Sequence, residues 1–410
     1  MKRFTTLVLV AVSPLAALAA CSTDETSPPV QSQPDGGTVI DPGDASASAD
    51  VAVDVPGDGD ARADGDASSP LCSVDHFCHT DVPKGQNLRG VWSDGQGTTW
   101  AVSLEGDVLR WDGMQWSIHQ HLTSEGGIFS IFGVGPTDIW IPTDAGLMHG
   151  TGTSSASLVF APVTLPGDET SPIKSVWGVG PNDLWAAGGN ELWDVPSAVG
   201  RVVHFTGPVE NGGGGWLVDD TFPSDSVEVL AAWGSPTSGL WIYGSKMLDF
   251  DLVGVAMRRL PGATGWTSVD VPPDPTTPRL AGPHYFLAGA LSSDDSVWLS
   301  GAAGAESVPV FYHGTKSAAG NGKFDWAYTK RYEWDRPVVG FWGLGVNDTW
   351  SVGQAGLVAH WDGTAWKQAV TRVTELPVAN MFWAAHGVSK DDFWVVGDQI
   401  ALHRTNAGKP

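Results

Sequence analysis

Residues 339–366, VGFWGLGVNDTWSVGQAGLVAHWDGTAW, hold one complete copy of a unit that recurs along this chain of 410 residues. The GVND and DG stretches inside it favour tight turns, because Gly, Asn and Asp tolerate the backbone angles that a reversal needs. The apolar residues between the turns alternate as they do in half-buried strands. The unit therefore predicts four short strands: the first ends near Trp342, the second holds Trp350, the third runs from Leu357 to Trp361 and the fourth begins at Trp366.

A tryptophan marks the second strand of each copy, and successive copies are 40 to 57 residues apart. These tryptophans are Trp100, Trp140, Trp185, Trp241, Trp298, Trp350 and Trp394. The positions eight residues earlier are Trp92, Phe132, Trp177, Trp233, Ala290, Trp342 and His386. This spacing is typical of four-stranded propeller blades, and we interpret the repeat tryptophans as packing residues, because a single blade cannot bury both of its faces. We expect an all-β, seven-bladed β-propeller; the degenerate fifth copy leaves six or eight blades open.

The last copy stops after Arg404 without a fourth strand. An N-terminal strand from Val74–Gly85 would complete that blade and remove an open sheet edge. The propeller is accordingly expected over residues 71–410, with residues 72–86 closing the last blade.

The N-terminus has the layout of a secretory signal: a basic start at Met1–Phe4, an apolar run at Leu7–Val12, and LAAC at residues 18–21. The apolar run is too short to span a bilayer. The LAAC ending resembles the lipobox of bacterial lipoproteins. That resemblance implies a signal peptide at residues 1–20, cleavage before Cys21 and lipidation of Cys21. Ser22, in place of an Asp, favours the outer membrane, with the protein facing the periplasm or the cell surface.

Residues 22–70 contain no aromatic residue and eleven acidic residues against Arg62 alone. Such a segment cannot bury enough apolar surface to fold, so residues 21–70 are expected to form a lipidated, disordered acidic tether. The acidic run at 58–66 could instead bind calcium, but it lacks the central Gly and terminal Glu of a helix-loop-helix site.

Cys72 and Cys78 remain after Cys21 is assigned to lipid, and in an exported protein they are expected to form a disulfide. The alternative is a Cys/His metal site with His76 and His79, although the spacing is not that of a zinc motif. A pair of histidines on one strand face, His119 and His121, lacks an evident third ligand.

Catalytic motifs are missing from the sequence: it has no Gly-rich phosphate loop, no Gly-x-Ser-x-Gly elbow and no helix with paired histidines. We therefore expect no catalytic residue, no metal and no cofactor, and favour a protein that is not an enzyme. The formal net charge of −24 repels nucleic-acid phosphates, which argues against a nucleic-acid partner.

Two further resemblances carry implications. Residues 93–100, SDGQGTTW, resemble the Asp-box of neuraminidase-type propellers, but Gly95 stands where that family has Asp, and its catalytic residues have no counterpart here. Over residues 88–404, the cadence of Val-Trp-Gly, Asp-x-Trp-x-Val-Gly and His-Trp-Asp-Gly-x-x-Trp resembles the Trp-rich propeller repeats of bacterial surface lipoproteins, and more distantly tectonin-type propellers. The tectonin resemblance implies carbohydrate binding without locating it.

Long connections in the third to sixth copies share one face of the expected propeller and are rich in aromatic, acidic and basic residues. Aromatic rings beside carboxylates and an Arg suit sugar stacking with hydrogen-bonded hydroxyls. The candidate ligand-binding residues are Glu191, Trp193, Asp194, Asp249, Asp251, Arg279, His284, Tyr285, Tyr332, Trp334 and Asp335. We expect a monomeric, non-catalytic binding module for a glycan or an envelope protein. The alternatives are a glycoside hydrolase or lyase and a scaffold subunit of an envelope complex.

Overall fold

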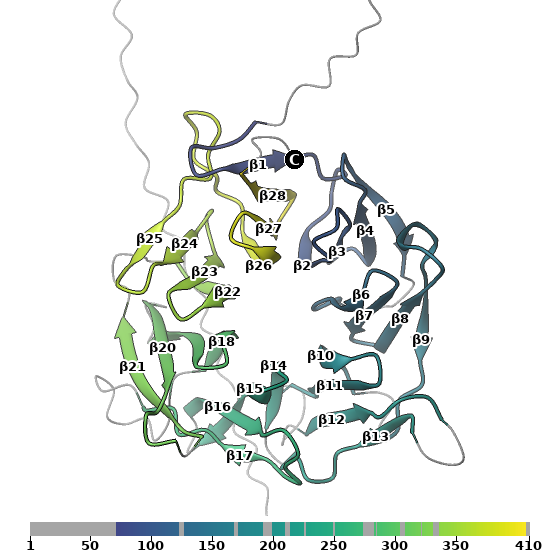
Figure 1. Cartoon of the computed structure of the whole chain (residues 1–410), viewed down its shortest axis with the longest axis vertical. Helices are drawn as coiled ribbons and strands as arrows, with labels where there is room; N and C mark the ends of the chain where they lie inside the picture. Colours follow the sequence, from purple (N-terminus) through teal and green to yellow (C-terminus); the bar gives the residue numbers. More distant parts are fainter. Residues whose placement is uncertain are drawn as a thin grey trace, which may run out of the picture. The chain divides into compact units, whose positions relative to one another are not determined.

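The computed structural model describes residues 71–406 except for short connections, which are residues 123–126, 168–170, 192–198, 210–213, 225–226, 249–250, 274–282, 284, 304–307, 321 and 331–335. The described residues form seven antiparallel sheets of four strands each. Figure 1 shows these sheets as the blades of a ring, with one strand of each blade next to the ring axis. The predicted all-β, seven-bladed propeller is confirmed.

The first three blades each take four consecutive strands. Blade 1 holds β2 (Leu88–Ser93), β3 (Thr99–Ser103), β4 (Asp107–Trp111) and β5 (Trp116–His121). Blade 2 holds β6 (Phe132–Gly135), β7 (Asp138–Thr143), β8 (Gly146–Thr151) and β9 (Val159–Val163), with the 3₁₀ turn η1 (Ser155–Ser157) before β9. Blade 3 holds β10 (Ile173–Gly180), β11 (Asp183–Gly189), β12 (Gly200–Phe205) and β13 (Trp216–Val218).

Blades 4 to 6 continue in the same way, and blade 7 takes three consecutive strands. Blade 4 holds β14 (Glu228–Ser235), β15 (Gly239–Leu248), β16 (Asp251–Arg259) and β17 (Thr267–Ser268). Blade 5 holds β18 (Phe286–Ser293), β19 (Ser296–Ala303), β20 (Val308–Lys316) and β21 (Phe324–Lys330). Blade 6 holds β22 (Val338–Gly345), β23 (Asp348–Gly353), β24 (Val358–Trp361) and β25 (Trp366–Gln368). The consecutive strands of blade 7 are β26 (Phe382–Ser389), β27 (Asp392–Gly397) and β28 (Ile400–Thr405). Within the described residues, no helix has the length and apolar character needed to cross a bilayer.

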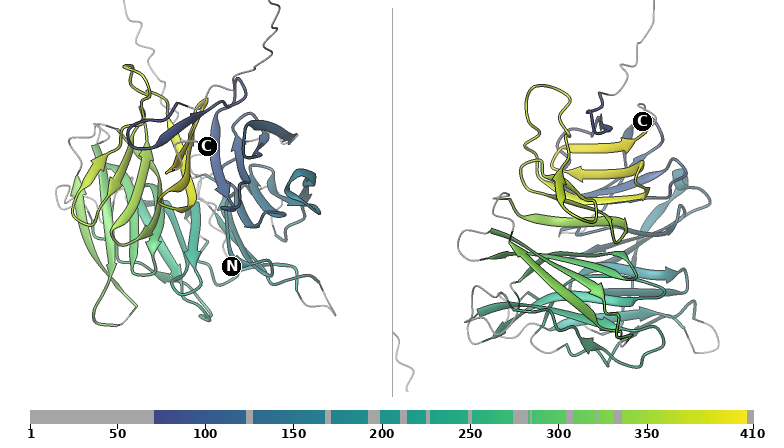
Figure 2. Two further views of the ribbon diagram at one scale, coloured as in Figure 1. Left: turned by 45° about the horizontal axis from the view of Figure 1, so that its top comes forward. Right: turned by 60° about the vertical axis from the view of Figure 1, so that its left-hand side comes forward.

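The outer strand of blade 7 comes from the other end of the propeller. Strand β1 (Phe77–Thr80) pairs antiparallel with β28, and Phe77 lies opposite Arg404. Figure 2 shows the purple β1 beside the yellow C-terminal strands. Phe77 is fully buried and makes edge contacts with Trp350 and Phe393, at centroid distances of 5.8 and 5.7 Å. The ring is therefore closed by a strand that precedes the first repeat.

A disulfide joins Cys72 and Cys78 immediately beside this closing strand. The predicted pairing of these cysteines is confirmed. The alternative Cys/His metal site is wrong, because a disulfide sulfur is no longer a thiolate that could bind a metal.

The seven repeat tryptophans are buried, each at most 8 % exposed. The residue opposite each of them on the third strand is a basic one: histidine in blades 2, 3, 5, 6 and 7, and arginine in blades 1 and 4. The His149 ring, for example, stacks on Trp140 at 3.6 Å, and its Nε2 lies 2.7 Å from Asp138. The same Trp–His–Asp arrangement occurs in blades 3, 6 and 7.

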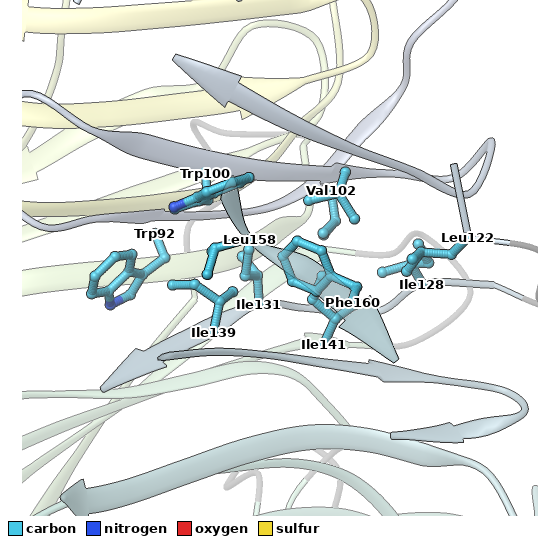
Figure 3. Close-up of a cluster of buried hydrophobic side chains, with 11 residues drawn as sticks. Trp92, Trp100, Val102, Leu122, Ile128, Ile131, Ile139, Ile141, Leu158 and Phe160 are labelled. Carbon is cyan, nitrogen blue, oxygen red and sulfur yellow. The ribbon is translucent and has the colours of Figure 1, made fainter. Parts of the chain in front are cut away.

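Aromatic side chains of the following blade cover the other side of these tryptophans. Trp100 meets Phe160 of blade 2, and Trp298 meets Trp366 of blade 6, at centroid distances of 5.8 and 5.1 Å. Figure 3 shows this packing between blades 1 and 2, with Trp92 and Trp100 on one side of Ile139 and Phe160. The core thus lies between blades, so each blade depends on its neighbours for burial.

Candidate functional site

The first strand of the blades carries a β-bulge at a fixed position. In six blades the pairing with the second strand shifts by one residue, and the residue at the step has no partner opposite it. In blade 2 the same shift separates the bridge Ile128–Thr143 from the pair Phe132–Trp140. We call the residues at the step the bulge ring; they are Arg89, Phe129, Lys174, Leu230, Leu287, Val339 and Trp383.

The bulge ring lies around the axis of the propeller on one face. The first strands are the innermost strands of the blades (Figure 1), and each bulge lies where the chain enters its blade. Because neighbouring strands are antiparallel, this end of the first strand lies beside the turn between the second and third strands. A β-bulge commonly directs a side chain to a functional position. The ring therefore places one bulged residue of every blade near the same face.

Two members of the bulge ring touch each other across the junction of blades 7 and 1. The Arg89 guanidinium lies over the Trp383 ring, 3.9 Å from its centroid. Asp398, in the turn between β27 and β28, accepts a hydrogen bond from Trp383 Nε1 at 2.8 Å and lies 3.4 Å from Arg89 Nη1. Burial lowers the pKa of Arg89, whereas the charges of Asp398 and Glu105 act in the opposite direction. This cluster is a cation held over an aromatic face, a geometry that orients the guanidinium.

A second cation occupies the bulge of blade 3. Lys174 Nζ lies 3.2 Å from Glu228 of blade 4 and 3.3 Å from Glu191. Lys174 is buried and Glu228 nearly so, but the Glu191 side chain is 49 % exposed. Glu191 is thus a predicted site residue whose carboxylate fixes a member of the bulge ring and still faces solvent.

Small residues follow the bulge and let neighbouring first strands approach closely. They are Gly90, Ser130, Ser175, Ala231, Ala288, Gly340 and Ala384. A Cβ at Gly90 would lie 3.1 Å from the backbone of Ser130, and one at Gly340 would lie 3.0 Å from the Trp383 carbonyl oxygen. Ser130 Oγ donates a hydrogen bond to the Lys174 carbonyl oxygen at 3.3 Å. These backbone contacts hold the bulge ring in a fixed geometry.

Most of the predicted ligand-binding residues lie outside the described residues, so their role stays a prediction. These are Trp193, Asp194, Asp249, Arg279, His284, Tyr332, Trp334 and Asp335. Asp251 begins β16, but its side chain is outside the described atoms. Tyr285 is half-buried just before β18, two positions before the bulge residue Leu287.

His119 and His121, the histidine pair considered as metal ligands, each bond to a different group of the protein. His119 Nε2 bonds to the Leu158 carbonyl oxygen, and His121 Nδ1 bonds to Asp107, each at 2.8 Å. In the part of the chain that the structure describes, no group of three His, Cys, Asp or Glu residues is arranged to hold a metal ion.

The bulge ring was missed in the sequence because a register shift has no residue signature of its own. A signal was nevertheless present: in every copy a small residue stands two positions before the residue of the Trp92 type, and a chemically variable residue precedes it. Glycine, serine and alanine at that place indicate close approach of strands, so the neighbouring position could have been singled out.

Comparison with known proteins shows likeness in fold alone. The chain matches no protein-family model, and no curated protein is significantly similar to it. Among solved structures it is similar to YCF48 bound to D1 peptide, with a TM-score of 0.58 and 14 % identity over 83 % of this chain and 100 % of that one. Streptogramin B lyase gives a TM-score of 0.52 and 12 % identity, covering 80 % and 96 % of the two chains. The WD40 propeller domain of Doa1 gives 0.51 and 13 %, covering 83 % and 98 %.

Proposed function

We propose that this propeller is a non-catalytic binding module that holds a segment of a partner protein at the bulge ring. One observation carries the proposal: the backbone repeats the bulge, while the side chain at the bulge differs from blade to blade. At packing positions the residue type does not vary from blade to blade: the second strand of every blade keeps its buried tryptophan. A fixed frame that presents different side chains is what recognition of an asymmetric ligand requires.

The composition of the bulge ring suits a protein segment with apolar side chains and an acidic group. Phe129, Leu230, Leu287, Val339 and Trp383 are all partly exposed. Arg89 adds a partly exposed cation in blade 1, whereas the buried Lys174 in blade 3 is already paired with Glu191 and Glu228. Partly exposed apolar residues near a few charges are typical of surfaces that bind other proteins. One solved propeller of similar fold, YCF48, is bound to D1 peptide, which supports a peptide segment as the kind of ligand.

The cellular setting is part of the same proposal. Lipidation of Cys21 would anchor the chain in the outer membrane, and residues 22–70 would tether the propeller to that anchor. The partner would then be an envelope protein. A glycan bound by the connections that carry Trp193 and Trp334 is the alternative ligand on the same face.

The proposal is tested on β22, which offers a matched pair of positions. Val339 belongs to the bulge ring, whereas Leu344 is 46 % exposed near the opposite end of the same strand. A photo-crosslinking amino acid at position 339, in cells that produce the full chain, should crosslink one discrete partner. The same amino acid at position 344 should not. A Val339→Asp substitution should weaken binding of that partner at least tenfold, and Leu344→Asp should leave binding unchanged.

Equal crosslinking at both positions, or full binding by the Val339→Asp variant at an unchanged melting temperature, would overturn the proposal. If Val339→Asp does not fold, the position-339 crosslink still decides, because it leaves the strand backbone intact. Binding of a glycan that depends on Trp334 and not on Val339 would select the alternative ligand.

A further inference from the structure

A groove of about 330 Å³ lies between the outer parts of blades 4 and 5. Its walls come from β15, β16 and β17 on one side, and from β21 with the turn before it on the other. The turns between third and fourth strands contribute to it, so the groove opens on the face opposite the bulge ring. Its volume falls at the lower end of the range of about 300–1,000 Å³ that is typical of small-molecule sites.

Arg258 is fixed in the wall of this groove by its neighbours. Its Nε donates to the Ser238 carbonyl oxygen at 2.7 Å, its Nη1 to the Gly322 carbonyl oxygen at 2.9 Å, and its Nη2 to Ser238 Oγ at 3.2 Å. The guanidinium also lies over the rings of Trp241 and Phe324, 5.0 and 5.2 Å from their centroids. Both blades therefore hold the group in one orientation.

Arg258 has no carboxylate within ion-pair distance among the described residues. In blades 2, 3, 6 and 7, the residue that corresponds to Arg258, opposite the repeat tryptophan, is a histidine. That histidine bonds to an aspartate two residues before the tryptophan. Blade 4 has Gly239 there in place of the aspartate. Burial lowers the pKa of the Arg258 guanidinium, and the negative charge of Asp294 raises it. The group stays protonated near neutral pH.

The donor count leaves two N–H groups for a ligand. A guanidinium has five N–H donors, and the three bonds named above use one donor on each of its nitrogens. One donor remains on Nη1 and one on Nη2. Carboxylate oxygens can accept hydrogen bonds from both.

The remaining walls of the groove suit a sugar ring. Phe324 and Trp326 are half-buried and provide aromatic surface, while Thr267 and Ser268 are exposed and carry hydroxyl groups. Asp270 and Lys323 also line the groove, and the Asp270 carboxylate can accept hydrogen bonds from hydroxyl groups. Aromatic surface with a few convergent polar groups is typical of small-ligand sites.

We propose that the groove between blades 4 and 5 binds a sugar acid, whose carboxylate pairs with Arg258 and whose ring packs against Trp326. The sugar acid could be a free uronic acid or a residue of an acidic polysaccharide, since both present the same carboxylate. The bulge ring takes no part in this site.

Isothermal titration calorimetry with the mature chain tests the site, using glucuronic acid, a glucuronate-containing oligosaccharide, neutral glucose, and a glutamate-containing peptide as probes. We expect the two acidic sugars to bind and glucose to bind at least tenfold more weakly. Tighter binding of the oligosaccharide would identify a polysaccharide as the source. Binding of the glutamate peptide as tight as that of glucuronic acid would overturn the sugar assignment, as would equal binding of glucose or no binding of the acidic sugars.

Two variants assign the binding to the groove. Arg258→Gln removes the charge and should weaken binding of glucuronic acid at least tenfold, whereas Arg110→Gln, opposite Trp100 in blade 1, is the matched control and should have no effect. Ser268→Trp fills the groove from an exposed position and should also abolish binding. If Arg258→Gln does not fold, this second variant tests the site. Unchanged binding in a folded Arg258→Gln variant, or in Ser268→Trp, would overturn the proposal. A Val339→Asp variant should bind glucuronic acid normally, which separates this site from the proposed function.

Discussion

At the scale of single residues, each repeat tryptophan stands at the centre of a small polar network that the sequence only partly indicated. The tryptophans were predicted as packing residues and are buried. Their histidine and aspartate partners were not predicted, because Asp183 and His204 are 21 positions apart and an aspartate before a strand is usual in turns. Only strand pairing brings His204 Nε2 to within 2.7 Å of Asp183 Oδ1.

Blade 5 departs from this network, and the departure makes stability depend on pH. His313 stacks on Trp298 at 3.9 Å, but its Nε2 meets the hydroxyl of Ser296 and not a carboxylate. Burial lowers the pKa of His313 to about 4, below the value of about 6.5 for an exposed histidine. The unfolded chain therefore binds more protons between these two values, so this histidine reduces stability as the pH falls from about 6.5 to 4.

A His313→Gln substitution should remove that contribution. We expect the variant to be less stable than the natural protein at pH 7, because it loses the ring stack, and to show a smaller decrease in the free energy of unfolding between pH 6.5 and 4. Urea denaturation at several pH values measures both effects. An unchanged pH slope would show that His313 binds its proton equally well in the folded and the unfolded protein, so that burial does not lower its pKa.

At the scale of strands, the spacing of the first strands depends on the small residue after each bulge. Gly340→Val would place a branched side chain against the Trp383 carbonyl oxygen of blade 7. Overpacking of this kind costs about 1–3 kcal/mol, and we expect a lower melting temperature by calorimetry. Gly345→Val is the control on the same strand, because a Cβ there meets no heavy atom within 4 Å. Similar melting temperatures for the two variants would contradict the close approach of the strands.

The closing strand gives a second prediction at this scale. A chain that starts at Leu71 keeps β1, whereas one that starts at Gly85 loses it and exposes the backbone edge of β28. The longer chain should melt like the full-length protein and stay monomeric. The shorter one should melt earlier and aggregate, because unpaired strand edges associate. Light scattering and calorimetry compare the two, and identical behaviour would show that β1 does not stabilise the ring.

The strands themselves were predicted more completely than the site. Alternating residues and turn signals of the sixth copy sufficed to place its four strands, and the missing strand after Arg404 pointed to the segment that contains β1. The bulge ring could not be located in this way, because its position depends on pairing between strands. Lys174 illustrates the difference: its partners Glu191 and Glu228 come from two blades, and nothing local in the sequence relates them.

At the scale of the whole chain, membrane attachment is expected to depend on one residue. Cys21→Ser should move the protein from the membrane fraction to the soluble fraction, because a lipoprotein's acyl chains, and not the acidic protein surface, would provide the anchor. Fractionation followed by a salt wash measures this. Ser22→Ala serves as the control and should remain in the membrane. A Cys21→Ser variant that stays with the membrane after the wash would exclude the lipid anchor.

The pairing of β1 with β28 also has a consequence for how the propeller folds. Phe77 and Arg404 are partners although more than 300 residues separate them, and contacts of such high sequence separation form slowly because a long loop must first be closed. During synthesis β1 emerges before the blades, but its partner strand is made last. Until β28 has been made and has paired with β1, the blades that have already folded form an open arc, a state prone to aggregation. We therefore expect the yield of folded protein to depend on how quickly this last contact forms, and not only on the stability of the closed ring.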